Sequence, residues 1–454
     1  MSPEGNRRKL FGTDGIRGIA NQDLTPELAM KAGKAVVQAL RDAGQPFIIV
    51  GRDTRLSGDM LASALTAGIC SAGGLAADVG VLPTPAIAYL AQELSASAGI
   101  VVSASHNPMD YNGIKVFLAD GFKLPDELEL RVEELIESSD ELPRPEGSSV
   151  GRVIPVEKTG ELYLEHLRSI CGHDLSGMRV VLDCANGAAF RAAPELYHSM
   201  GAEVSSFYDQ PDGSNINLHC GSTRAEVLSE LVRSQGGDVG LAFDGDADRV
   251  IFADGQGNIV DGDYVLAICA SHMKNAGRLA CNTVVTTVMT NLGFRQAMER
   301  SGIEVIQTKV GDRYVLEEML ASGLNLGGEQ SGHVIFLDHS TTGDGLITGL
   351  KVLEVMAETG KSLGELAMVM QRLPQVLLNV EVEEPERLMG ANRVWEEVRR
   401  LEETLNGTGR ILLRPSGTEP LVRVMVEHAS EEDAAELAEY LAAAVRAEMG
   451  WGTR

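Results

Sequence analysis

Strand-length apolar segments that end abruptly in polar loops recur through most of this chain, and helix-length segments separate them. Residues 46–53 and 99–102 are two such apolar segments, and residues 59–74 between them have the pattern of a helix closed by two glycines. Strands that alternate with helices of this length indicate βαβ units and a mostly parallel sheet. Ligands bind at the carboxyl ends of the strands in such sheets, so the polar loops are the candidate functional segments.

The same pattern divides the chain into domains. Residues 138–151 are polar and contain two prolines, which is typical of a linker. After Pro374 come a strand, a charged helix near 391–405, a hairpin and a long helix over 430–448, an order that indicates a small α+β domain. We therefore predict four domains, at residues 1–153, 154–257, 258–372 and 373–454.

The charge balance excludes some classes of partner. The chain carries 65 acidic and 39 basic residues, which gives a formal net charge of −26. Nucleic acids and anionic membranes bind basic surfaces, so this balance argues against both as partners. A small anionic ligand remains compatible with it, because a local cationic pocket can form within a negatively charged protein.

Membrane and export segments are not expected. Every apolar run falls well short of the about 20 residues that span a bilayer, and the N-terminal stretch lacks the apolar core of a signal peptide. The cysteines form no CxxC pair and lie mostly among apolar residues, at Cys70, Cys171, Cys184, Cys220, Cys269 and Cys281. We interpret them as reduced core thiols, which predicts a cytoplasmic protein.

The first polar loop follows the apolar segment 99–102 and reads SASHNP, with a proline that disfavours a continuing helix. Ser105 in this loop is a candidate nucleophile or phosphoserine, and His106 stands beside it. The alternative is a structural turn in which serine and asparagine side chains cap the backbone. The chain contains no GxSxG elbow, so a hydrolase-type serine is not indicated.

The second polar loop, DGDADR, follows the apolar run VGLAF. In a partly buried site Asp244, Asp246 and Asp248 would repel one another strongly unless a cation were present. Ligand sets made only of oxygen favour a hard ion, so we expect Mg²⁺ rather than Zn²⁺. Arg249 can hold an anion beside the metal, and an EF-hand is excluded because Arg249 and Gly255 stand where Gly and Glu are needed. The alternative is a solvated acidic turn.

The third loop, GGEQSGH, spaces Glu329, Ser331 and His333 two residues apart between glycines. On an extended segment these three side chains would point to one side, which suits hydrogen bonding to sugar hydroxyl groups. The alternative is a glycine-rich β-turn.

The fourth loop, RPSGTEPLVR, belongs to the predicted C-terminal hairpin. Ser416, Gly417 and Thr418 can offer backbone N–H and hydroxyl donors, and Arg414 and Arg423 offer guanidinium groups. This combination suits a phosphate monoester, and the alternative is a hairpin turn with incidental arginines. It is not a Walker A loop, because the chain contains no GxxxxGK[ST].

Two further basic residues complete the set of candidates. Arg17 lies in the stretch FGTDGIRG, and Lys115 lies ten residues beyond Ser105. A single Arg or Lys is more often a solvated surface group, but Lys115 is near enough in sequence to reach the pocket of Ser105. Taken together, the loops offer a hydroxyl group, a metal site, a sugar clamp and a phosphate clamp.

These four motifs, in this order and spacing, resemble the α-D-phosphohexomutase superfamily over nearly the whole chain. The stretches FGTDGIRG, TVMTNLGF and TTGDG are most similar to the bacterial branch that acts on glucosamine phosphates. Gln330 also fits that branch, because relatives that act on mannose and glucose phosphates usually have Met at this position. One departure is HNPMDYNGIK, where an aromatic-Asp-Asn run is more usual, and it leaves Ser105 and Lys115 in place.

The resemblance implies an α/β fold of four domains, with three related mixed-sheet α/β/α units and a smaller C-terminal α+β domain around a central cleft. It also implies that Ser105 is phosphorylated in the active form. The implied catalytic residues are Ser105, Lys115, Arg17, His106, Arg249 and His333. The implied substrate-binding residues are Glu329, Ser331, Arg414, Ser416, Gly417, Thr418 and Arg423. The implied Mg²⁺ ligands are Ser105, Asp244, Asp246 and Asp248.

The implied reaction interconverts glucosamine 6-phosphate and glucosamine 1-phosphate. Phosphorylated Ser105 gives its phosphoryl group to the sugar, and the resulting glucosamine 1,6-bisphosphate, which also serves as activator, returns its other phosphoryl group. An isomerase of this kind supplies amino-sugar precursors for the cell wall. The resemblance further implies a homodimer formed through the first domain.

Three other interpretations compete with this one. The nearest is a phosphomannomutase/phosphoglucomutase of the same superfamily. The stretch LAFDGDAD also resembles the aspartyl-phosphate loop of haloacid-dehalogenase enzymes, in which Asp244 would be the nucleophile, but that loop has Thr or Val where Asp248 stands. A non-catalytic sugar-phosphate sensor would have lost the serine or an aspartate of the triad, and this chain keeps all of them.

Overall fold

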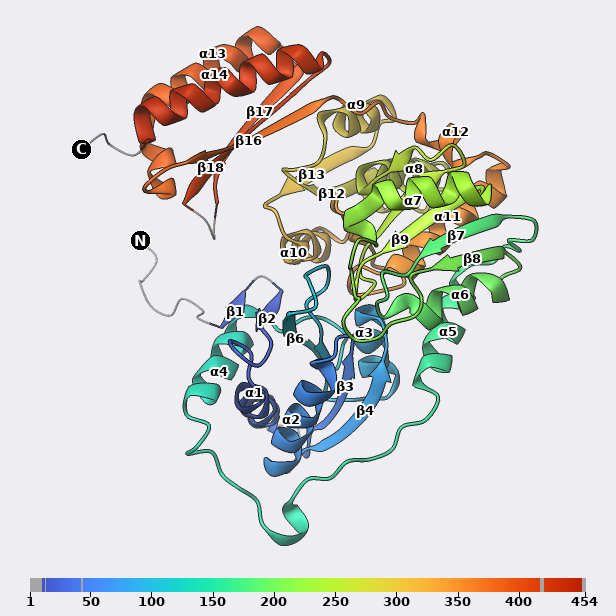
Figure 1. Cartoon of the computed structure of the whole chain (residues 1–454), viewed down its shortest axis with the longest axis vertical. Helices are drawn as coiled ribbons and strands as arrows, with labels where there is room; N and C mark the ends of the chain where they lie inside the picture. The colour runs from blue at the N-terminus through green and yellow to red at the C-terminus, as the bar shows by residue number, and fades with distance from the viewer. Residues whose placement is uncertain (1–9, 13, 42–43, 417–419, 451–454) are drawn as a thin grey trace. The chain divides into compact units, whose positions relative to one another are not determined.

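The chain, described by a computed structural model, folds into two compact units (Figure 1). The structure describes residues 10–12, 14–41, 44–416 and 420–450. The first unit comprises residues 1–289 and 302–369, and the second comprises residues 290–301 and 370–454. Three sheets belong to the first unit, and a fourth belongs to the second.

The first sheet has six strands and is mixed. Its elements are β1 (Phe11–Gly12), β2 (Gly15–Ile19), α1 (Pro26–Ala39), β3 (Phe47–Arg52), α2 (Gly58–Ser71), β4 (Leu75–Val81), α3 (Thr84–Glu93), β5 (Ala98–Val102), β6 (Tyr111–Leu118) and α4 (Asp126–Glu137). In the order β1-β2-β6-β5-β3-β4, the strands β5, β3 and β4 run parallel, as predicted, while β6 and β2 continue the sheet antiparallel. Apolar side chains of α1, α2 and α4 pack with the sheet into one core.

The second sheet has five strands. Its elements are α5 (Thr159–Ile170), β7 (Arg179–Asp183), α6 (Ala189–Ser199), β8 (Glu203–Phe207), η3 (Ser222–Arg224), α7 (Ala225–Gln235), β9 (Val239–Phe243), β10 (Val250–Asp254) and β11 (Ile259–Val260). The order is β11-β10-β9-β7-β8, with β8, β7 and β9 parallel and β10 and β11 antiparallel. All residues of β9 and β10 are buried, which explains why both segments are almost wholly apolar.

The third sheet has four strands. Its elements are α8 (Gly262–Asn275), η4 (Ala280–Asn282), β12 (Thr283–Thr287), β13 (Glu304–Thr308), α10 (Asp312–Ser322), β14 (Leu326–Gly328), β15 (Val334–Phe336), α11 (Gly345–Thr359) and α12 (Leu363–Ala367). The order is β13-β12-β14-β15, in which only the last pair is antiparallel. A turn of five residues between β14 and β15 carries the third candidate loop.

The second unit is the α+β arrangement that the C-terminal pattern predicts. Its elements are α9 (Leu292–Arg300), β16 (Gln375–Glu381), η5 (Pro385–Gly390), α13 (Asn392–Leu405), β17 (Gly409–Pro415), β18 (Leu421–His428) and α14 (Glu431–Met449). The three strands form an antiparallel sheet in the order β16-β18-β17, and α13 and α14 lie side by side along it (Figure 1). Valine and leucine side chains of the sheet and both helices form the core.

The polar loops of the first unit stand where the strand pattern places them. The Ser105 loop follows β5, the aspartate loop follows β9, and the third loop follows β14. Residues 138–151, the predicted linker, contain only a short 3₁₀ turn, η2 (Gly147–Ser149), and the chain beyond them pairs with β4 through Val153 and Ala76.

Two expectations drawn from composition can be compared with the structure. All six cysteines are free thiols, and Cys171, Cys184, Cys220 and Cys269 are buried as predicted. Cys281 is exposed, so the prediction of a core thiol was wrong there, because its apolar sequence neighbourhood forms the turn between α8 and β12. Among the described helices, none combines the length and the apolar character needed to cross a bilayer.

Candidate active site

The Ser105 loop meets the aspartate loop although the two are far apart in the sequence. Ser105 is fully buried, and its Oγ donates a hydrogen bond of 2.6 Å to Asp244 Oδ2. His106 Nδ1 lies 3.3 Å from the same Oγ. The backbone of Ser105 has φ of +52°, a left-handed conformation that costs free energy for any residue with a side chain. The structure therefore brings the predicted hydroxyl group to the predicted acidic cluster and holds it there under strain.

The aspartate loop buries three carboxylates together. Asp244, Asp246 and Asp248 are at most 3% exposed, and each offers an oxygen within 4.8 Å of those of the others. Asp246 Oδ1 and Asp248 Oδ1 are buried and accept no described hydrogen bond. Oxygen atoms that are buried, negatively charged and without a donor are what a hard cation requires, so these residues fit a metal ion of the Mg²⁺ class.

The surroundings shift the pKa values of Asp244 and Asp248 in opposite directions. Burial and the charges of Asp248 and Asp246 raise the pKa of Asp244 well above its usual range. Burial also opposes the ionisation of Asp248, but Lys115 and His333 outweigh it and hold the pKa of Asp248 well below its usual range. The loop thus keeps negative charge on Asp248 only because cations are placed against it.

Lys115 is one of those cations. It lies on β6 opposite Val101 of β5, and this register points its side chain at the aspartates. Its Nζ lies 2.9 Å from Asp246, 3.3 Å from Asp248 and 3.0 Å from Asp14. Burial opposes its charge, but these carboxylates outweigh burial and raise the pKa of Lys115 well above its usual range. Lys115 is therefore held as a charged ammonium group, which suits it to stabilise negative charge and not to act as a base.

Asp14, Lys123 and Asp312 belong to the same network, and the sequence reasoning missed them. Asp14 pairs with Lys115 and also with Lys123 at 2.5 Å, while Lys123 pairs with Asp312. Burial opposes ionisation of Asp14, but Lys115 and Lys123 outweigh it and hold the pKa of Asp14 well below its usual range. The signal for Asp14 was its place in FGTDGIRG, three residues before Arg17.

Arg17 and Arg249 add positive charge at the mouth of this cluster. Arg17 pairs with Asp14 at 2.5 Å, and Arg249 lies 3.0 Å from His106 Nδ1. Burial and the nearby Arg249 lower the pKa of His106 to about 4, so this imidazole is neutral at physiological pH. A cavity of about 390 Å³ is lined by Leu10, Gly12, Asp14, Gly15, Arg17, Asp248, Arg249, Val310, Gly311, Asp312, Glu329 and His333.

The third loop is a turn, which is one of the two forms that its sequence left open. Residues 329–333 form a turn, in which Gly332 has φ of +89° and donates to the carbonyl of Glu329 at 3.0 Å. Because a turn lacks the two-residue periodicity of a strand, only Glu329 and His333 of the three line the cavity. His333 is buried 3.8 Å from Asp248, Glu329 lines the cavity, and Ser331 is exposed.

The fourth loop belongs to the second unit. Arg414 and Arg423 are directly paired across β17 and β18, so two guanidinium groups of like charge lie next to each other. Burial and the charge of Arg423 lower the pKa of Arg414. Ser416 is buried and its N–H donates to the carbonyl of Leu421 at 2.9 Å. Gly417 and Thr418 lie outside the described residues. Two adjacent positive charges repel each other, and a bound anion would relieve that repulsion. This arrangement is compatible with the predicted phosphate site.

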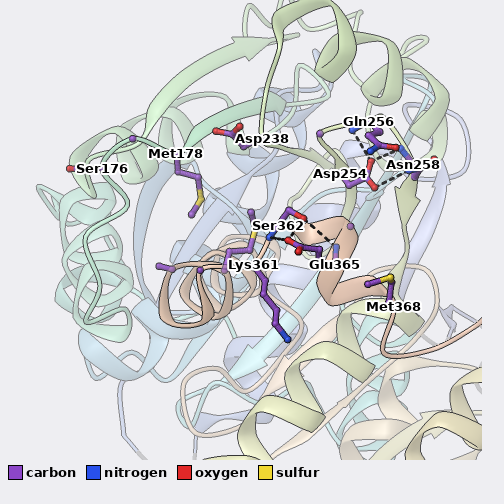
Figure 2. Close-up of a pocket in the computed structure, with 16 residues that line it drawn as sticks. Ser176, Met178, Asp238, Asp254, Gln256, Asn258, Lys361, Ser362, Glu365 and Met368 are labelled. Carbon is purple, nitrogen blue, oxygen red and sulfur yellow. Dashed lines mark hydrogen bonds between the residues drawn. The ribbon is translucent and has the colours of Figure 1, made fainter.

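A larger cavity of about 780 Å³ lies elsewhere in the first unit (Figure 2). Several of its polar groups bond to one another: Asp254 accepts from Gln256 and Asn258, and Ser362 and Glu365 form a capping box at the start of α12. These contacts are the dashed lines in Figure 2. These bonded residues stabilise turns and a helix end, and none of the predicted site residues lines the cavity.

Hydrogen bonds from neighbouring segments hold the aspartate loop in place. Thr84 Oγ1 donates to Asp246 at 2.6 Å, and Gly345 N–H at the start of α11 donates to the carbonyl of Ala247 at 2.9 Å. Asp344 caps α11 through one carboxylate oxygen and accepts from the Tyr163 hydroxyl at 2.7 Å through the other. Burial raises the pKa of Asp344 to about 6.

Comparison with protein families identifies the class to which this site belongs. Models of the phosphoglucomutase/phosphomannomutase α/β/α domains I, II and III and of the C-terminal domain match residues 8–143, 161–257, 261–373 and 377–444. The matches cover most of the chain, so the chain belongs to the phosphoglucomutase/phosphomannomutase family and is an isomerase of the phosphohexomutase class.

Several curated proteins that are similar to this chain over most of its length are phosphoglucosamine mutases. The phosphoglucosamine mutase of Desulforamulus reducens is 56% identical over 92% of this chain and 95% of its own length. The phosphoglucosamine mutase of Moorella thermoacetica is 54% identical over 94% of this chain and 96% of its own length.

Solved structures share the fold. A phosphoglucomutase/phosphomannomutase family protein from Burkholderia thailandensis aligns with a TM-score of 0.82 at 24% identity, covering 96% of this chain and 97% of that chain. A putative phosphomannomutase from Thermus thermophilus aligns with a TM-score of 0.76 at 25% identity, covering 94% and 97%.

Asp344→Asn should change how stability depends on pH while it keeps the helix cap, because Asn Oδ1 accepts the same N–H groups and Nδ2 can donate to Tyr163. The pKa of Asp344 is about 6 in the folded chain against a usual value of 3.8. The stability contributed by its protonation is complete below the usual value and is lost as the pH rises through about 6. The parent should therefore gain about 1 kcal/mol over the variant between about pH 7 and about pH 5.

Urea unfolding of both proteins at the two pH values measures this difference. Other titrating groups are shared by the two proteins and cancel in the comparison. A difference in unfolding free energy that stays constant with pH would contradict the prediction.

Proposed function

We propose that this chain is a phosphoglucosamine mutase that interconverts glucosamine 6-phosphate and glucosamine 1-phosphate through a phosphorylated Ser105. The observation that carries the proposal is the 2.6 Å hydrogen bond from Ser105 Oγ to Asp244, one of three buried aspartates that have a cation, Lys115, against them. The similarity to phosphoglucosamine mutases at 56% identity favours glucosamine among the hexoses. By family relationship, a phosphomannomutase/phosphoglucomutase activity is the alternative.

The charge around Ser105 suits a serine that carries phosphate. A phosphoserine adds about −1.5 to −2 charge at neutral pH, and three carboxylates already lie beside it. Lys115, which is buried, and Arg249, which is half-buried, are cations placed against this charge, at 2.9 Å from Asp246 and 3.7 Å from Asp248 respectively. Positioning and charge stabilisation are the main needs of phosphoryl transfer.

Asp244, Asp246 and Asp248, together with an oxygen on Ser105, are the residues that would hold Mg²⁺. When bound, the ion neutralises charge on the phosphoryl oxygens and polarises the phosphorus for attack. The two buried aspartate oxygens without a donor support this assignment.

The transfer moves one phosphoryl group and one proton. A sugar hydroxyl oxygen forms a bond to the phosphorus as the bond from phosphorus to Ser105 Oγ breaks, and the hydroxyl proton leaves at the same time. The neutral His106 beside Ser105 Oγ is proposed to accept the proton of the sugar hydroxyl group, and the ammonium group of Lys115 is proposed to give a proton to the departing Ser105 oxygen. The raised pKa of Lys115 argues against its acting as a base. The reverse step, with the other phosphate of glucosamine 1,6-bisphosphate, restores phosphorylated Ser105.

The substrate needs two phosphate environments, because the reacting and the spectator phosphate exchange places. Arg17, Arg249 and His333 are proposed for the reacting phosphate at the cavity, and Glu329 and Ser331 for the sugar hydroxyl groups. The proposed residues for the spectator phosphate are Arg414, Ser416, Gly417, Thr418 and Arg423. Free bisphosphate, as activator, would load Ser105 on a chain that has lost its phosphate.

The proposal extends to the setting of the enzyme. We infer domains at residues 1–153, 154–257, 258–372 and 373–454, with the Ser105, aspartate, sugar and phosphate loops in that order. We also infer a homodimer through the first domain and a cytoplasmic enzyme that supplies cell-wall precursors. The free, mostly buried thiols support the cytoplasmic location.

A parallel assay with three sugars tests the substrate. The 6-phosphates of glucosamine, glucose and mannose are each incubated with enzyme, Mg²⁺ and a trace of hexose 1,6-bisphosphate, and formation of the 1-phosphates is followed. We expect kcat/KM for glucosamine 6-phosphate to exceed the other two by about 10-fold or more. Equal or higher values for mannose or glucose would instead support the alternative activity.

Ser105→Ala tests the phosphoryl carrier. We expect turnover to fall by at least about 10³-fold, because the transfer loses its acceptor and donor oxygen. The intact mass of the parent should show a phosphate adduct of about 80 Da that the variant lacks. Ser234→Ala, on an exposed helix face, is the matched control and should behave like the parent. Full activity of Ser105→Ala, or an acyl phosphate labile to hydroxylamine, would refute the assignment.

Removal of the metal tests the aspartate triad. Treatment with EDTA followed by desalting should lower turnover by at least about 100-fold, and added Mg²⁺ should restore it. Asp246→Asn should stay slow after Mg²⁺ is added back, because one anionic ligand is missing. Turnover that survives chelation unchanged would show that the triad acts without a metal.

A further inference from the structure

Arg55 is buried under the loop that carries Ser105. Its side chain is 0% exposed. Nη2 donates hydrogen bonds to the carbonyl oxygens of Ser105 at 2.9 Å and Asn107 at 2.8 Å, and Nη1 donates to the carbonyl of Pro108. A guanidinium group presents these donors from one rigid plane, which the single ammonium of a lysine cannot do. Arg55 therefore binds the backbone carbonyl groups of three residues of this loop.

Asp53 links the same guanidinium group to the other side of Ser105. Asp53 Oδ2 accepts hydrogen bonds from Arg55 Nε at 2.9 Å and from Ser103 Oγ at 2.6 Å. Ser103 Oγ in turn accepts from the N–H of Ser105 at 3.0 Å. Both backbone polar groups of Ser105 are thus bound within one buried network, the carbonyl by Arg55 and the N–H through Ser103.

The topology explains why this network can exist. β3 and β5 are adjacent parallel strands, so the segment after β3, with Asp53 and Arg55, and the segment after β5, with Ser105, leave the sheet at the same edge. Asp53 and Arg55 of the stretch GRDTR therefore contact the Ser105 loop, which lies about 50 residues further along the chain.

The network holds Ser105 in a conformation that it would not adopt by preference. A residue with a side chain keeps a left-handed φ such as +52° only when its surroundings determine it from several sides. In that conformation Oγ reaches Asp244 at 2.6 Å. Asn217 Nδ2 also donates to the Ser105 carbonyl at 2.9 Å, but the N–H side depends on Ser103 and Asp53.

We propose that Arg55 is a positioning residue for phosphoryl transfer. With Asp53 and Ser103 it fixes the backbone of Ser105 so that Oγ points at the aspartate triad. The inference rests on the proposed function of Ser105. Arg55, Asp53 and Ser103 are not among the residues that line the cavity, so the loss of Arg55 should act on the rate of transfer and not on sugar binding.

Arg55→Lys tests the proposal, with Arg52→Lys as the matched control. Arg52 is the last residue of β3, three residues before Arg55, but it pairs with the exposed Asp59 and Asp78 at 2.7 Å each. Lysine keeps the charge beside Asp53 and lacks the fork of donors. The parent and both variants are assayed for kcat and KM with glucosamine 6-phosphate, and circular dichroism and thermal unfolding check that each is folded.

We expect kcat of Arg55→Lys to fall by about 10²-fold with KM within about threefold of the parent, since a shift of about 1 Å in a reacting atom has an effect of that size. Arg52→Lys should match the parent in both constants. Ser103→Ala is the second variant, and it removes only the hydroxyl group that joins Asp53 to the Ser105 N–H. Its kcat should fall by about 10-fold, again with KM retained.

The outcomes separate the inference from the proposed function. If the parent protein shows no mutase turnover, the proposed function is overturned, and so is the inference that rests on it. An active parent with a folded Arg55→Lys of unchanged kcat, or with KM and kcat changed equally, overturns the inference alone. If Arg55→Lys does not fold, Ser103→Ala decides: a selective fall in kcat supports the role of the network, and an unchanged kcat overturns it.

Discussion

The crowding of negative charge beside one serine is the constraint on which the rest of this site depends. Asp244, Asp246 and Asp248 are buried within 4.8 Å of one another, and Ser105 Oγ bonds directly to the first of them. Such a cluster is stable only where cations and hydrogen-bond donors are placed against it. Lys115 meets this need within the chain, and the donor-free oxygens leave room for a cation from solution.

The sheets provide that placement by bringing the ends of strands together. The carboxyl ends of β5 and β9 contribute the serine and the aspartates, and the register of β6 against β5 points Lys115 at them. Each of these side chains stands on or directly beside a buried strand, so the surrounding core limits its movement. A rigid frame of this kind lets a strained residue such as Ser105 persist, because relaxing it would disturb the packed elements on both sides.

Much of the site could be predicted from the sequence, and the failures share a physical cause. Ser105, the aspartates and the C-terminal hairpin were evident because each follows an apolar run that must be a buried strand. The shape of residues 329–333 stayed open between an extended segment and a turn, since the glycines there permit a turn as readily as an extended chain. Asp14, Lys123 and Arg55 were missed because an isolated charged residue in sequence does not reveal whether it is exposed to water or buried against a partner.

The sequence by itself determined the succession of strands and helices, the chemical kinds of group at the strand ends, and the need for a cation among the aspartates, because periodicity and charge are local properties of a chain. Only the tertiary structure decided which distant groups meet. The contacts of Ser105 with Asp244, of Lys115 with Asp14, and of Arg55 with the serine loop all join residues from different strands or loops. Their energies depend on burial and on separations of a few ångströms, and those quantities exist only once the sheets have formed.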